Sequence, residues 1–371
     1  MDTFREILDN HHEYARQWRQ RTEGKVLGYL APYFTEELVY AAGVLPVRIL
    51  SRRDNDGIAQ RYLYGQFCPT TLGLLAQGLK GAYDYLDGVG HAECCMCNRA
   101  CFSSWLLHVP AAQKYNHYIS IPAYVDQPGA DDLVRAELSV FRKELEEWTG
   151  RTITDEALDR AIEVYNTNRR LTRQLYELRR NDSPPVSGAE VMEITLAGQV
   201  MDKAEHNVLL EEVLRSLDGN GVTNSSGPRL MFLGSEVSDT GLFEAIESAG
   251  ATIVIDGLCN GMSYIWNTVI PQPDRLMAIA RYYLDKPRCP MKDVTLRRRP
   301  VELINLATDY RVEGVIYATQ KFSYPHHYDR PPIEALLKER WLPVHNLEYS
   351  DTVPAAETRD RIEAFLDTIR R

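Results

Sequence analysis

Short apolar runs alternate with amphipathic stretches along the first third of the chain. The apolar runs are bounded by turn residues, as buried strands are, and they predict strands at residues 25–30, 44–50, 83–89 and 115–121. The stretches between them repeat apolar residues at helical spacing, and they predict helices at residues 1–24, 35–43, 69–80 and 98–107. Strands that alternate with helices in this way favour an open parallel sheet covered by helices.

The same alternation returns in the last third of the chain, from Arg229 onward. Here the apolar runs predict strands at residues 229–234, 251–256, 314–320 and 341–349. We expect a loop and a helix over 235–250, and further helices at residues 273–284, 300–309 and 357–370. Two segments that follow strands, 257–263 and 321–329, are predicted to be loops.

The middle of the chain has a different texture. From Asp131 to about Leu217 it is rich in Glu, Arg, Leu and Ala with helical periodicity, and its charges are typical of a solvated face. We therefore predict an α/β protein with two parallel-sheet domains, at residues 1–130 and 229–371, joined by a helical linker or insertion at 131–228.

Composition and charge exclude several classes of protein. Hydrophobic residues make up 44% of the chain and charged residues 25%, as in soluble globular proteins. The chain has no apolar run of the ~18–20 residues that a membrane span needs, and its N-terminus has no apolar signal segment, so we expect a cytoplasmic protein. The net charge of −10 argues against nucleic acid as a partner. The basic run at 297–299 is more typical of a solvated loop, although it could meet the phosphates of an anionic cofactor. No glycine-rich phosphate loop follows a first strand, which argues against dinucleotide or nucleoside triphosphate binding.

Cysteine is crowded into one stretch, His91 to Trp105. Four of the seven cysteines lie there, and a fifth precedes them: Cys94, Cys95, Cys97, Cys101 and Cys68. A lone cysteine is usually a small buried hydrophobe, but thiols crowded together in a reducing compartment indicate a soft metal or redox chemistry rather than disulfides.

The predicted sheet brings these thiols to one edge. Ligands of parallel sheets bind at the carboxyl ends of the strands, where Cys68 and the cluster after the third strand would fall. Cys97 and Cys101 are four residues apart, so a helix would place both on one side. One plausible ligand set is therefore Cys68, Cys95, Cys97 and Cys101. Four thiolates suit either an iron–sulfur centre or a closed zinc site.

An ordered set of motifs over nearly the whole chain is similar to the 2-hydroxyacyl-CoA dehydratase / benzoyl-CoA reductase component family, and most closely to its smaller non-ATPase reductase subunit. The set includes ARQW at 15–18, KVLGYLAPYFTEELVYAAGVLPVRI at 25–49, Cys68-Pro69 with Gly73, and Cys95, Arg99 and Trp105. It continues with GRTITDEALDRAIEVYNTNRR, PPVSGAE, Asp256-x-Leu258-Cys259-x-Gly261, RYYLDKPRCP, GVIYATQKF and TRDRIEAF.

The resemblance implies two flavodoxin-like domains with a [4Fe–4S] cluster, or a related iron–sulfur centre, in the cleft between them. It also implies an acyl-CoA substrate, a heterodimer core with a homologous larger subunit, and electrons from an ATP-hydrolysing activator or from ATPase subunits. Cys68 and Cys95 match the family's ligand positions. The third family cysteine falls at Ser323, a poor iron ligand, and the aspartate that usually follows the second is Met96.

Because Ser323 departs from the pattern, we expect at least one of Cys94, Cys97 or Cys101 to serve as a further metal ligand, with Ser323 still beside the cofactor. Asp256 and Cys259 end a strand that faces the same cleft and are candidates for contact with the cofactor, whereas Cys289 is expected to be a core cysteine. Proton delivery near neutral pH points to His326, His327 and Glu93, although the two histidines are equally typical of a polar loop.

Three functions remain open at this point. The first is a subunit of an oxygen-sensitive, ATP-driven reductase of an aromatic acyl-CoA, as in anaerobic aromatic degradation. The second is a lyase, a component of a 2-hydroxyacyl-CoA dehydratase. The third is a companion subunit without catalysis, in which the serine at position 323 marks a site that only builds an interface or relays electrons.

Overall fold

Two four-stranded parallel sheets form the framework of the protein, in a computed structural model that describes residues 1–51, 57–217, 227–293, 295, 298–350 and 355–370. The first sheet has the order β2-β1-β3-β4, with β1 at Lys25–Tyr29, β2 at Val44–Arg48, β3 at Gly88–Ala92 and β4 at Asn116–Ile119. The second has the order β6-β5-β7-β8, with β5 at Arg229–Gly234, β6 at Thr252–Asp256, β7 at Gly314–Gln320 and β8 at Val344–Tyr349. All six strand pairs are parallel, which confirms the predicted α/β class with two parallel-sheet domains.

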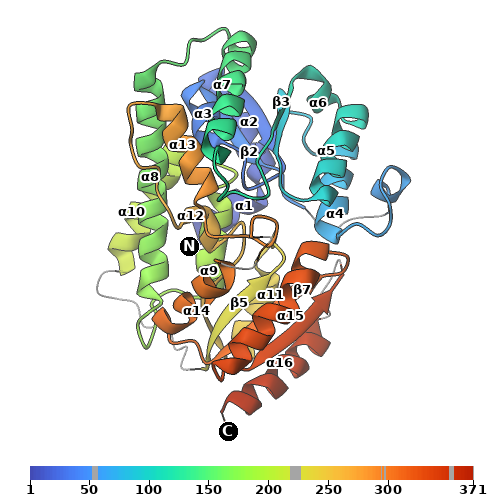
Figure 1. The fold of residues 1–371 in the computed structure, drawn as a ribbon, viewed down its shortest axis with the longest axis vertical. Coiled ribbons are helices and arrows are strands. Elements are labelled where there is room, and N and C mark those ends of the chain that lie inside the picture. Colours follow the sequence, from blue (N-terminus) through green and yellow to red (C-terminus); the bar gives the residue numbers. More distant parts are fainter. Residues whose placement is uncertain (52–56, 218–226, 294, 296–297, 351–354, 371) are drawn as a thin grey trace.

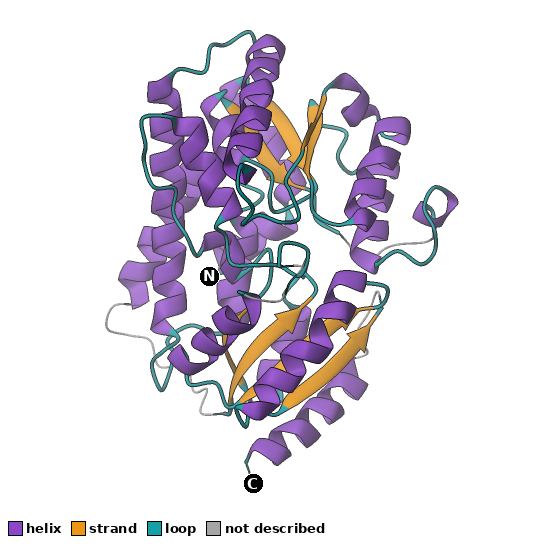
Figure 2. Cartoon of the chain, in the orientation of Figure 1, coloured by secondary structure: helices purple, strands orange, loops and turns teal. Residues whose placement is uncertain are grey.

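Helices cover both faces of each sheet, and loops gather between the sheets (Figures 1 and 2). The first half contains α1 at Asp2–Asp9, α2 at His11–Thr22, α3 at Glu36–Ala41, a 3-10 turn at Ala59–Arg61, α4 at Pro69–Leu79, α5 at Met96–His108 and α6 at Pro110–Lys114. The last third contains α11 at Gly241–Ser248, α12 at Met262–Ile265, α13 at Arg275–Leu284, α14 at Arg299–Asp309, α15 at Tyr324–Glu339 and α16 at Ala355–Ile369. Parallel strands buried on both faces need such cover, because every side chain of the inner strands points into a core.

The middle segment forms four helices that pack on both halves of the molecule. They are α7 at Ala130–Thr149, α8 at Asp155–Leu178, α9 at Gly188–Ala197 and α10 at Lys203–Leu217. Helix α7 packs against α13, α8 against α3 and α10, and α9 against α11. Helix α13 therefore adds Leu276 and Ile279 to the core of the first sheet, although it follows the second sheet's β6 in the chain.

The first helix also crosses between halves. Phe4 is 1% exposed and lies in the core of the second sheet together with Val191 and Leu233. Helix α1 packs on α9, and Arg5 Nε donates a hydrogen bond to Glu193 Oε1 at 2.7 Å. The chain's first turn is thus held by residues that lie almost two hundred positions later.

Three sequence predictions are wrong in their boundaries. Residues 1–24, expected to form one helix, form α1 and α2 with a turn at Asn10 between them. The third strand runs over 88–92 instead of 83–89, because residues 83–85 form a turn and the strand contains two glycines, which are weak strand formers. Gly90 is required there, since a Cβ would meet the ring of Phe34 at 2.2 Å. Residues 324–329, expected to be a loop, form the first turns of α15, and Pro325 sits where a helix start tolerates proline.

The basic run at 297–299 is also different from the expected solvated loop. Arg297 lies outside the described residues. Arg299 is 2% exposed, and its Nε donates to Asp329 Oδ2 at 2.9 Å, so this guanidinium belongs to a buried ion pair. Arg298 is partly exposed and pairs with Asp285.

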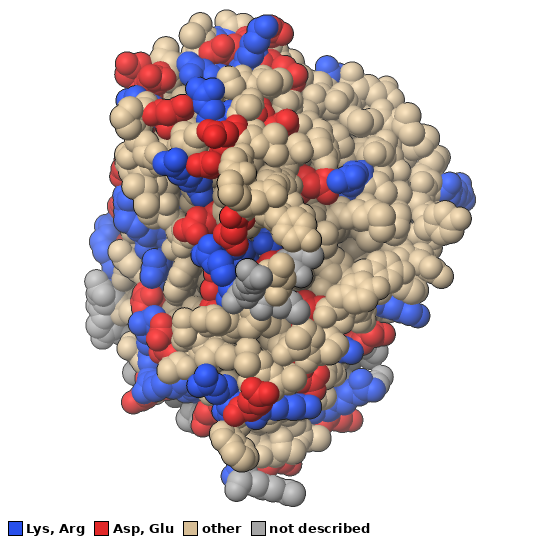
Figure 3. Space-filling model, in the orientation of Figure 1, with Lys and Arg blue, Asp and Glu red and all other residues tan. Residues whose placement is uncertain are grey.

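Charge is mixed on the face drawn in Figure 3. Acidic and basic side chains are interspersed on the left of that view, and the right side carries few charges. No helix among the described residues is both long enough and apolar enough to span a membrane.

Candidate functional site

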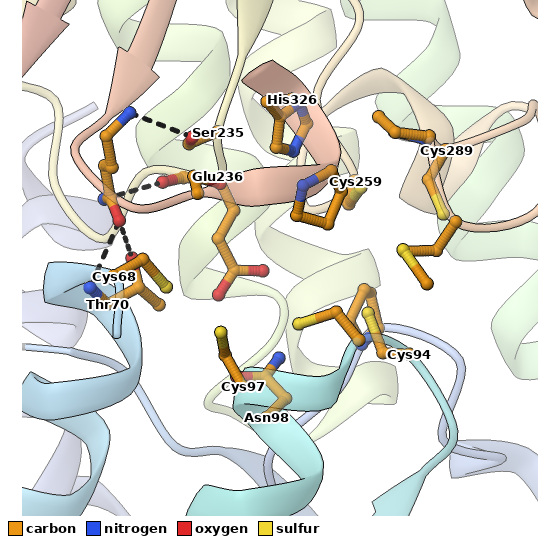
Figure 4. A pocket seen from close by; sticks show the side chains of 17 residues that line it. Cys68, Thr70, Cys94, Cys97, Asn98, Ser235, Glu236, Cys259, Cys289 and His326 are labelled. Atoms are coloured by element: carbon orange, nitrogen blue, oxygen red, sulfur yellow. Dashed lines mark hydrogen bonds between the residues drawn. The ribbon is translucent and has the colours of Figure 1, made fainter. Parts of the chain in front are cut away.

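The carboxyl ends of both sheets point toward one cavity between them, as parallel sheets are expected to present their ligand sites. The cavity has a volume of about 70 Å³. Six of the seven cysteines line it: Cys68, Cys94, Cys95, Cys97, Cys259 and Cys289. Figure 4 shows thiols reaching the cavity from both halves of the chain.

Two helix starts position the thiols of the first half. Cys68 is the N-cap residue of α4 and Cys95 that of α5, and both have extended backbone. Cys68 Sγ lies 3.1 Å from Thr71 Oγ1. Cys94, Cys95 and Cys97 lie together at the start of α5 and line the same cavity. Four thiols of the first half therefore share one cavity wall.

Two loops of the second half bring the remaining thiols. Cys259 lies in the loop after β6, which Asp256 holds in shape. The Asp256 carboxylate accepts hydrogen bonds from the backbone N–H groups of Leu258 and Met262 and from the Tyr176 hydroxyl, at 3.0, 2.9 and 2.6 Å. Cys289 follows α13 and lines the cavity with Cys259, and its Sγ accepts a hydrogen bond from the Tyr33 hydroxyl at 3.5 Å.

Hydrogen bonds between thiols and burial determine which thiols ionise. The hydrogen bond to Cys68, followed by burial, raises the pKa of Cys97 to about 11. For Cys95 the hydrogen bond from Cys94 lowers the pKa, but the bond to Cys97 and burial outweigh it and raise the pKa to about 12. Hydrogen bonding to Cys95 and burial also raise the pKa of Cys94. Metal binding at these thiols must therefore release protons.

Polar side chains link the two halves across the cavity. The buried Arg48, at the end of β2, donates from Nη2 to both carboxylate oxygens of Glu236 at 3.1 and 2.9 Å. Thr70 donates its backbone N–H and its hydroxyl to Gln320 Oε1 at 3.1 and 2.8 Å. In Figure 4 the Glu236 side chain extends toward Cys97, so a carboxylate shares the space with the thiols.

The structure places two further predicted residues on the cavity wall, Ser323 and His326. Ser323 is the N-cap residue of α15, and its side chain makes no capping hydrogen bond. Burial, with the nearby Arg299 charge, lowers the pKa of His326 to about 3. The imidazole is therefore neutral at physiological pH and cannot donate a proton as an imidazolium there.

Four predicted residues are not among those that line the cavity. Cys101 is fully buried in the core of the first sheet, where its thiol faces the Thr71 carbonyl at 3.6 Å. Glu93 accepts hydrogen bonds from Arg99 Nε and Nη2 at 2.9 and 2.6 Å. His327 lies 3.8 Å from Glu348. Asp256 acts from behind the wall, through the loop that carries Cys259.

Sequence reasoning missed Glu236 with its partner Arg48, and it expected Cys289 to be a plain core cysteine. Cys289 is indeed only 4% exposed, but it lies on the cavity wall. One signal could have found it: Cys289-Pro290 repeats the Cys68-Pro69 pair that opens α4. Arg48 and Glu236 carry no comparable signal, because only the packing of the two sheets brings them together.

The donor set fits a soft metal. Six thiols around one cavity match iron–sulfur or zinc chemistry, which prefers thiolate sulfur. Among the described residues, no three His, Cys, Asp or Glu side chains are already placed to hold a single metal ion. Because neighbouring thiols and burial raise the pKa values of Cys95 and Cys97, metal binding at this site is coupled to the loss of protons.

Comparisons with known proteins agree with one another. The model of the family "2-hydroxyglutaryl-CoA dehydratase, D-component" matches residues 32–369. The C-type subunit of benzoyl-CoA reductase from Thauera aromatica is 28% identical, over 96% of this chain and 94% of its own length. The (R)-phenyllactyl-CoA dehydratase beta subunit of Clostridium sporogenes is 23% identical, over 99% and 97%. The (R)-2-hydroxyglutaryl-CoA dehydratase beta subunit of Acidaminococcus fermentans is 23% identical, over 93% and 92%.

Proposed function

The chain belongs to the 2-hydroxyglutaryl-CoA dehydratase D-component family, and on this premise we propose that it is a subunit of an iron–sulfur enzyme that reduces an aromatic acyl-CoA. The six thiols that line one cavity carry the proposal. The relative from benzoyl-CoA reductase supports the reductase, and the match covers nearly the whole chain.

The cofactor we propose is a [4Fe–4S] cluster or a related iron–sulfur centre. Cys68 and Cys95 are its first ligands, and Cys94 or Cys97 supplies a further thiolate, since both lie beside Cys95 on the cavity wall. Cys101 is the weakest of the proposed ligands, because its thiol points into the core. When bound, such a centre transfers single electrons at a potential set by its hydrogen bonds and burial.

The chain's own residues shape the space beside the thiols. Proline and methionine side chains limit the access of water, from Pro32, Pro290, Met291 and Pro325. Ser323 and the neutral His326 offer hydrogen bonds to a bound group, while Glu236 offers a carboxylate held by Arg48. Proton transfer by His327 or Glu93 would have to occur outside the cavity as it stands.

Partners follow from the same proposal. The relatives are named as subunits, and we propose that this chain pairs with a homologous larger subunit in a heterodimer core. Low-potential electrons come from an ATP-hydrolysing activator or from ATPase subunits, and the complex works in the cytoplasm. The substrate is an acyl-CoA thioester.

A lyase is the second candidate. The relatives from Clostridium sporogenes and Acidaminococcus fermentans are named as dehydratase beta subunits, and the match with the first covers 97% of that relative's length. In that case the chain is a component of a 2-hydroxyacyl-CoA dehydratase. Assays of benzoyl-CoA reduction and of 2-hydroxyacyl-CoA dehydration, each with the partner proteins supplied, separate the two reactions.

Anaerobic purification followed by iron and acid-labile sulfide counts and EPR tests the cofactor. We expect about four iron and four sulfide per chain, as in one cubane. A count well above four would mean that Cys259 and Cys289 also hold iron. A preparation that contains zinc or no metal, and still supports full activity with its partner, would contradict the proposal and favour a companion subunit.

A further inference from the structure

Two lysines beside the cavity are buried without a carboxylate partner. Lys286 and Lys292 are each 3% exposed. Lys286 Nζ donates to the Pro32 carbonyl at 2.9 Å, and Lys292 Nζ donates to the carbonyls of Ile121 and Pro122 at 3.0 and 3.3 Å. Among the described residues, no Asp or Glu oxygen lies within ion-pair distance of either nitrogen. A buried charge without a counter-charge is costly in free energy.

The buried arginines of the same segment show the usual arrangement instead. Arg288 donates from Nη2 to Asp126 Oδ1 at 2.6 Å, and Arg299 donates from Nε to Asp329 Oδ2 at 2.9 Å. Buried charges in proteins are normally paired in this way. The two lysines depart from the rule that their neighbours in the chain follow, so their counter-charge is left for another group to supply.

Both ammonium groups lie next to the cavity. Each nitrogen is 5.4 Å from the centroid of the Tyr33 ring, and the Tyr33 hydroxyl donates to Cys289 Sγ at 3.5 Å. Lys292 also closes a turn, because its backbone N–H donates to the Cys289 carbonyl at 3.0 Å. The three residues before it, 289–291, all line the cavity, as does Pro32, whose carbonyl Lys286 holds.

The two lysines differ in the negative charges that act on them. Burial lowers the pKa of both, that of Lys286 to about 8. At Lys292 the first negative charge that opposes this effect is that of the Cys289 thiol. At Lys286 it is that of Glu36, followed by that of Glu37. Lys292 is therefore the lysine more directly coupled to the thiols.

We propose that Lys292, assisted by Lys286, balances the negative charge of a metal–thiolate centre in the cavity, strengthens its binding and raises its reduction potential. The identity of that centre rests on the proposed function. Each thiolate ligand brings a negative charge and reduction adds one more, so a nearby cation stabilises the reduced state more than the oxidised state. At about 10 Å and an effective dielectric constant of about 20, one charge changes such an equilibrium roughly tenfold.

The first test is a redox titration of the iron-loaded, full-length chain, followed by EPR without oxygen. Lys292→Gln removes the charge and keeps a donor for the two carbonyls, and it should shift the midpoint potential to more negative values. A tenfold effect on a one-electron couple is about 59 mV. Lys292→Arg keeps the charge and should restore most of the parent's potential. An unchanged potential in Lys292→Gln, or an equal shift in Lys292→Arg, would overturn the proposal.

Lys286→Gln provides a second variant should Lys292→Gln fail to fold. It should shift the potential in the same direction but by less, because Glu36 and Glu37 also act on Lys286. Lys203→Gln is the matched control, since Lys203 is 2% exposed and its Nζ donates to the Tyr264 hydroxyl at 2.7 Å, away from the cavity lining. A control shift as large as that of the Lys286 and Lys292 variants would contradict the proposal.

Zinc binding separates this proposal from the proposed function. Four thiolates outweigh the charge of Zn²⁺, so Lys292→Gln should weaken Zn²⁺ binding roughly tenfold in competition with a chromophoric chelator. A chain that takes up no iron but shows this loss contradicts the proposed function alone. A chain that assembles the iron centre, with neither a shifted potential nor weaker Zn²⁺ binding in Lys292→Gln, contradicts the role of the lysines alone.

Discussion

The two sheets have the same strand order but present different chemistry at matching places. In each sheet the third strand along the chain, β3 or β7, leads through a short loop into a helix, α5 or α15. The N-cap residue is Cys95 in the first case and Ser323 in the second, and both line the cavity. The same position therefore carries sulfur in one half and oxygen in the other.

Strand order therefore fixes where a ligand residue lies, but it does not fix whether that residue supplies sulfur or oxygen. The loop after the first strand of each sheet also reaches the cavity, with Pro32 in one half and Glu236 in the other. The second half adds sulfur elsewhere, through Cys259 and Cys289. If the comparison holds, metal binding depends on the thiols at the two helix starts of the first half.

The largest expected effect is the loss of the centre. Cys95→Ala or Cys68→Ala should abolish iron binding, because an open cubane rarely tolerates losing one of three thiolates. Ser323→Ala, at the matching position of the second half, should retain iron, and Cys289→Ala should do so as well. Iron and sulfide counts after anaerobic reconstitution measure this, with Cys101→Ala as the core control. Full iron content in Cys95→Ala would show that metal binding does not depend on the helix starts of the first half.

A second prediction concerns the ion pair that joins the halves. Glu236→Leu leaves the Arg48 guanidinium buried without its carboxylate, and one Arg48 nitrogen, Nη1, already has no hydrogen-bond partner among the described residues. Removing one partner of a buried pair costs about 3–5 kcal/mol, which urea unfolding would register. Glu236→Gln keeps an acceptor and should lose less. Equal stability of both variants and the parent would show that the pair does not hold the halves together.

The halves are alike in burying a neutral histidine, His91 in β3 and His326 in α15. Burial, with nearby arginine charge, lowers the pKa of each to about 3. Because the folded pKa lies below the unfolded value of about 6.5, this stability is fully present above pH 6.5 and is lost as pH falls toward 3. The loss should approach roughly 1.4 kcal/mol per pH unit for each histidine.

Replacing one histidine at a time tests whether His91 and His326 contribute equally to the pH dependence of stability. Between pH 6.5 and 4.5, His326→Gln should reduce the slope of the unfolding free energy against pH by about the contribution of one bound proton. His91→Gln should do the same. Urea titrations at several pH values give the slope. A slope that does not change in either variant would mean that the buried imidazoles bind protons in the folded state.

The smallest expected effect is that of Ser323→Cys, which makes the two N-cap positions chemically equal. Because Ser323 makes no capping hydrogen bond, the change should cost less than about 1 kcal/mol, the usual worth of a cap. We expect unchanged folding and an altered EPR spectrum of the reconstituted protein, as a thiolate becomes available at the family position. A spectrum identical to that of the parent would show that this position does not reach the centre.

Much of the fold follows from local sequence signals. The strand β7 lies where its apolar run predicts it, and Cys68-Pro69 opens α4 as expected. The apolar pattern places the third strand too early, because Gly88 and Gly90 lack the apolar side chains that mark a strand. These glycines suit the sheet because other residues pack closely against them, as the ring of Phe34 does against Gly90. Such contacts join residues far apart in sequence, and the apolar pattern does not contain them.

The candidate site was predictable only where it is local. Cys95 and Cys97 follow a strand end, and the structure places both on the cavity wall. Cys101 shares their stretch but lies one turn deeper in α5, about 5.4 Å along the axis, where it faces the core. Glu236 and Cys289 reach the cavity only because distant loops meet there, which neither periodicity nor motif spacing encodes.

The docking of α1 on α9 also sets an order of events during synthesis. Arg5 and Glu193 are separated by 188 positions, so at 5–20 residues per second the first helix waits roughly ten to forty seconds for its partner. Through that interval Phe4 has no core to enter. We expect nascent chains shorter than about Ala197 to keep this segment open to proteolysis and to chaperones.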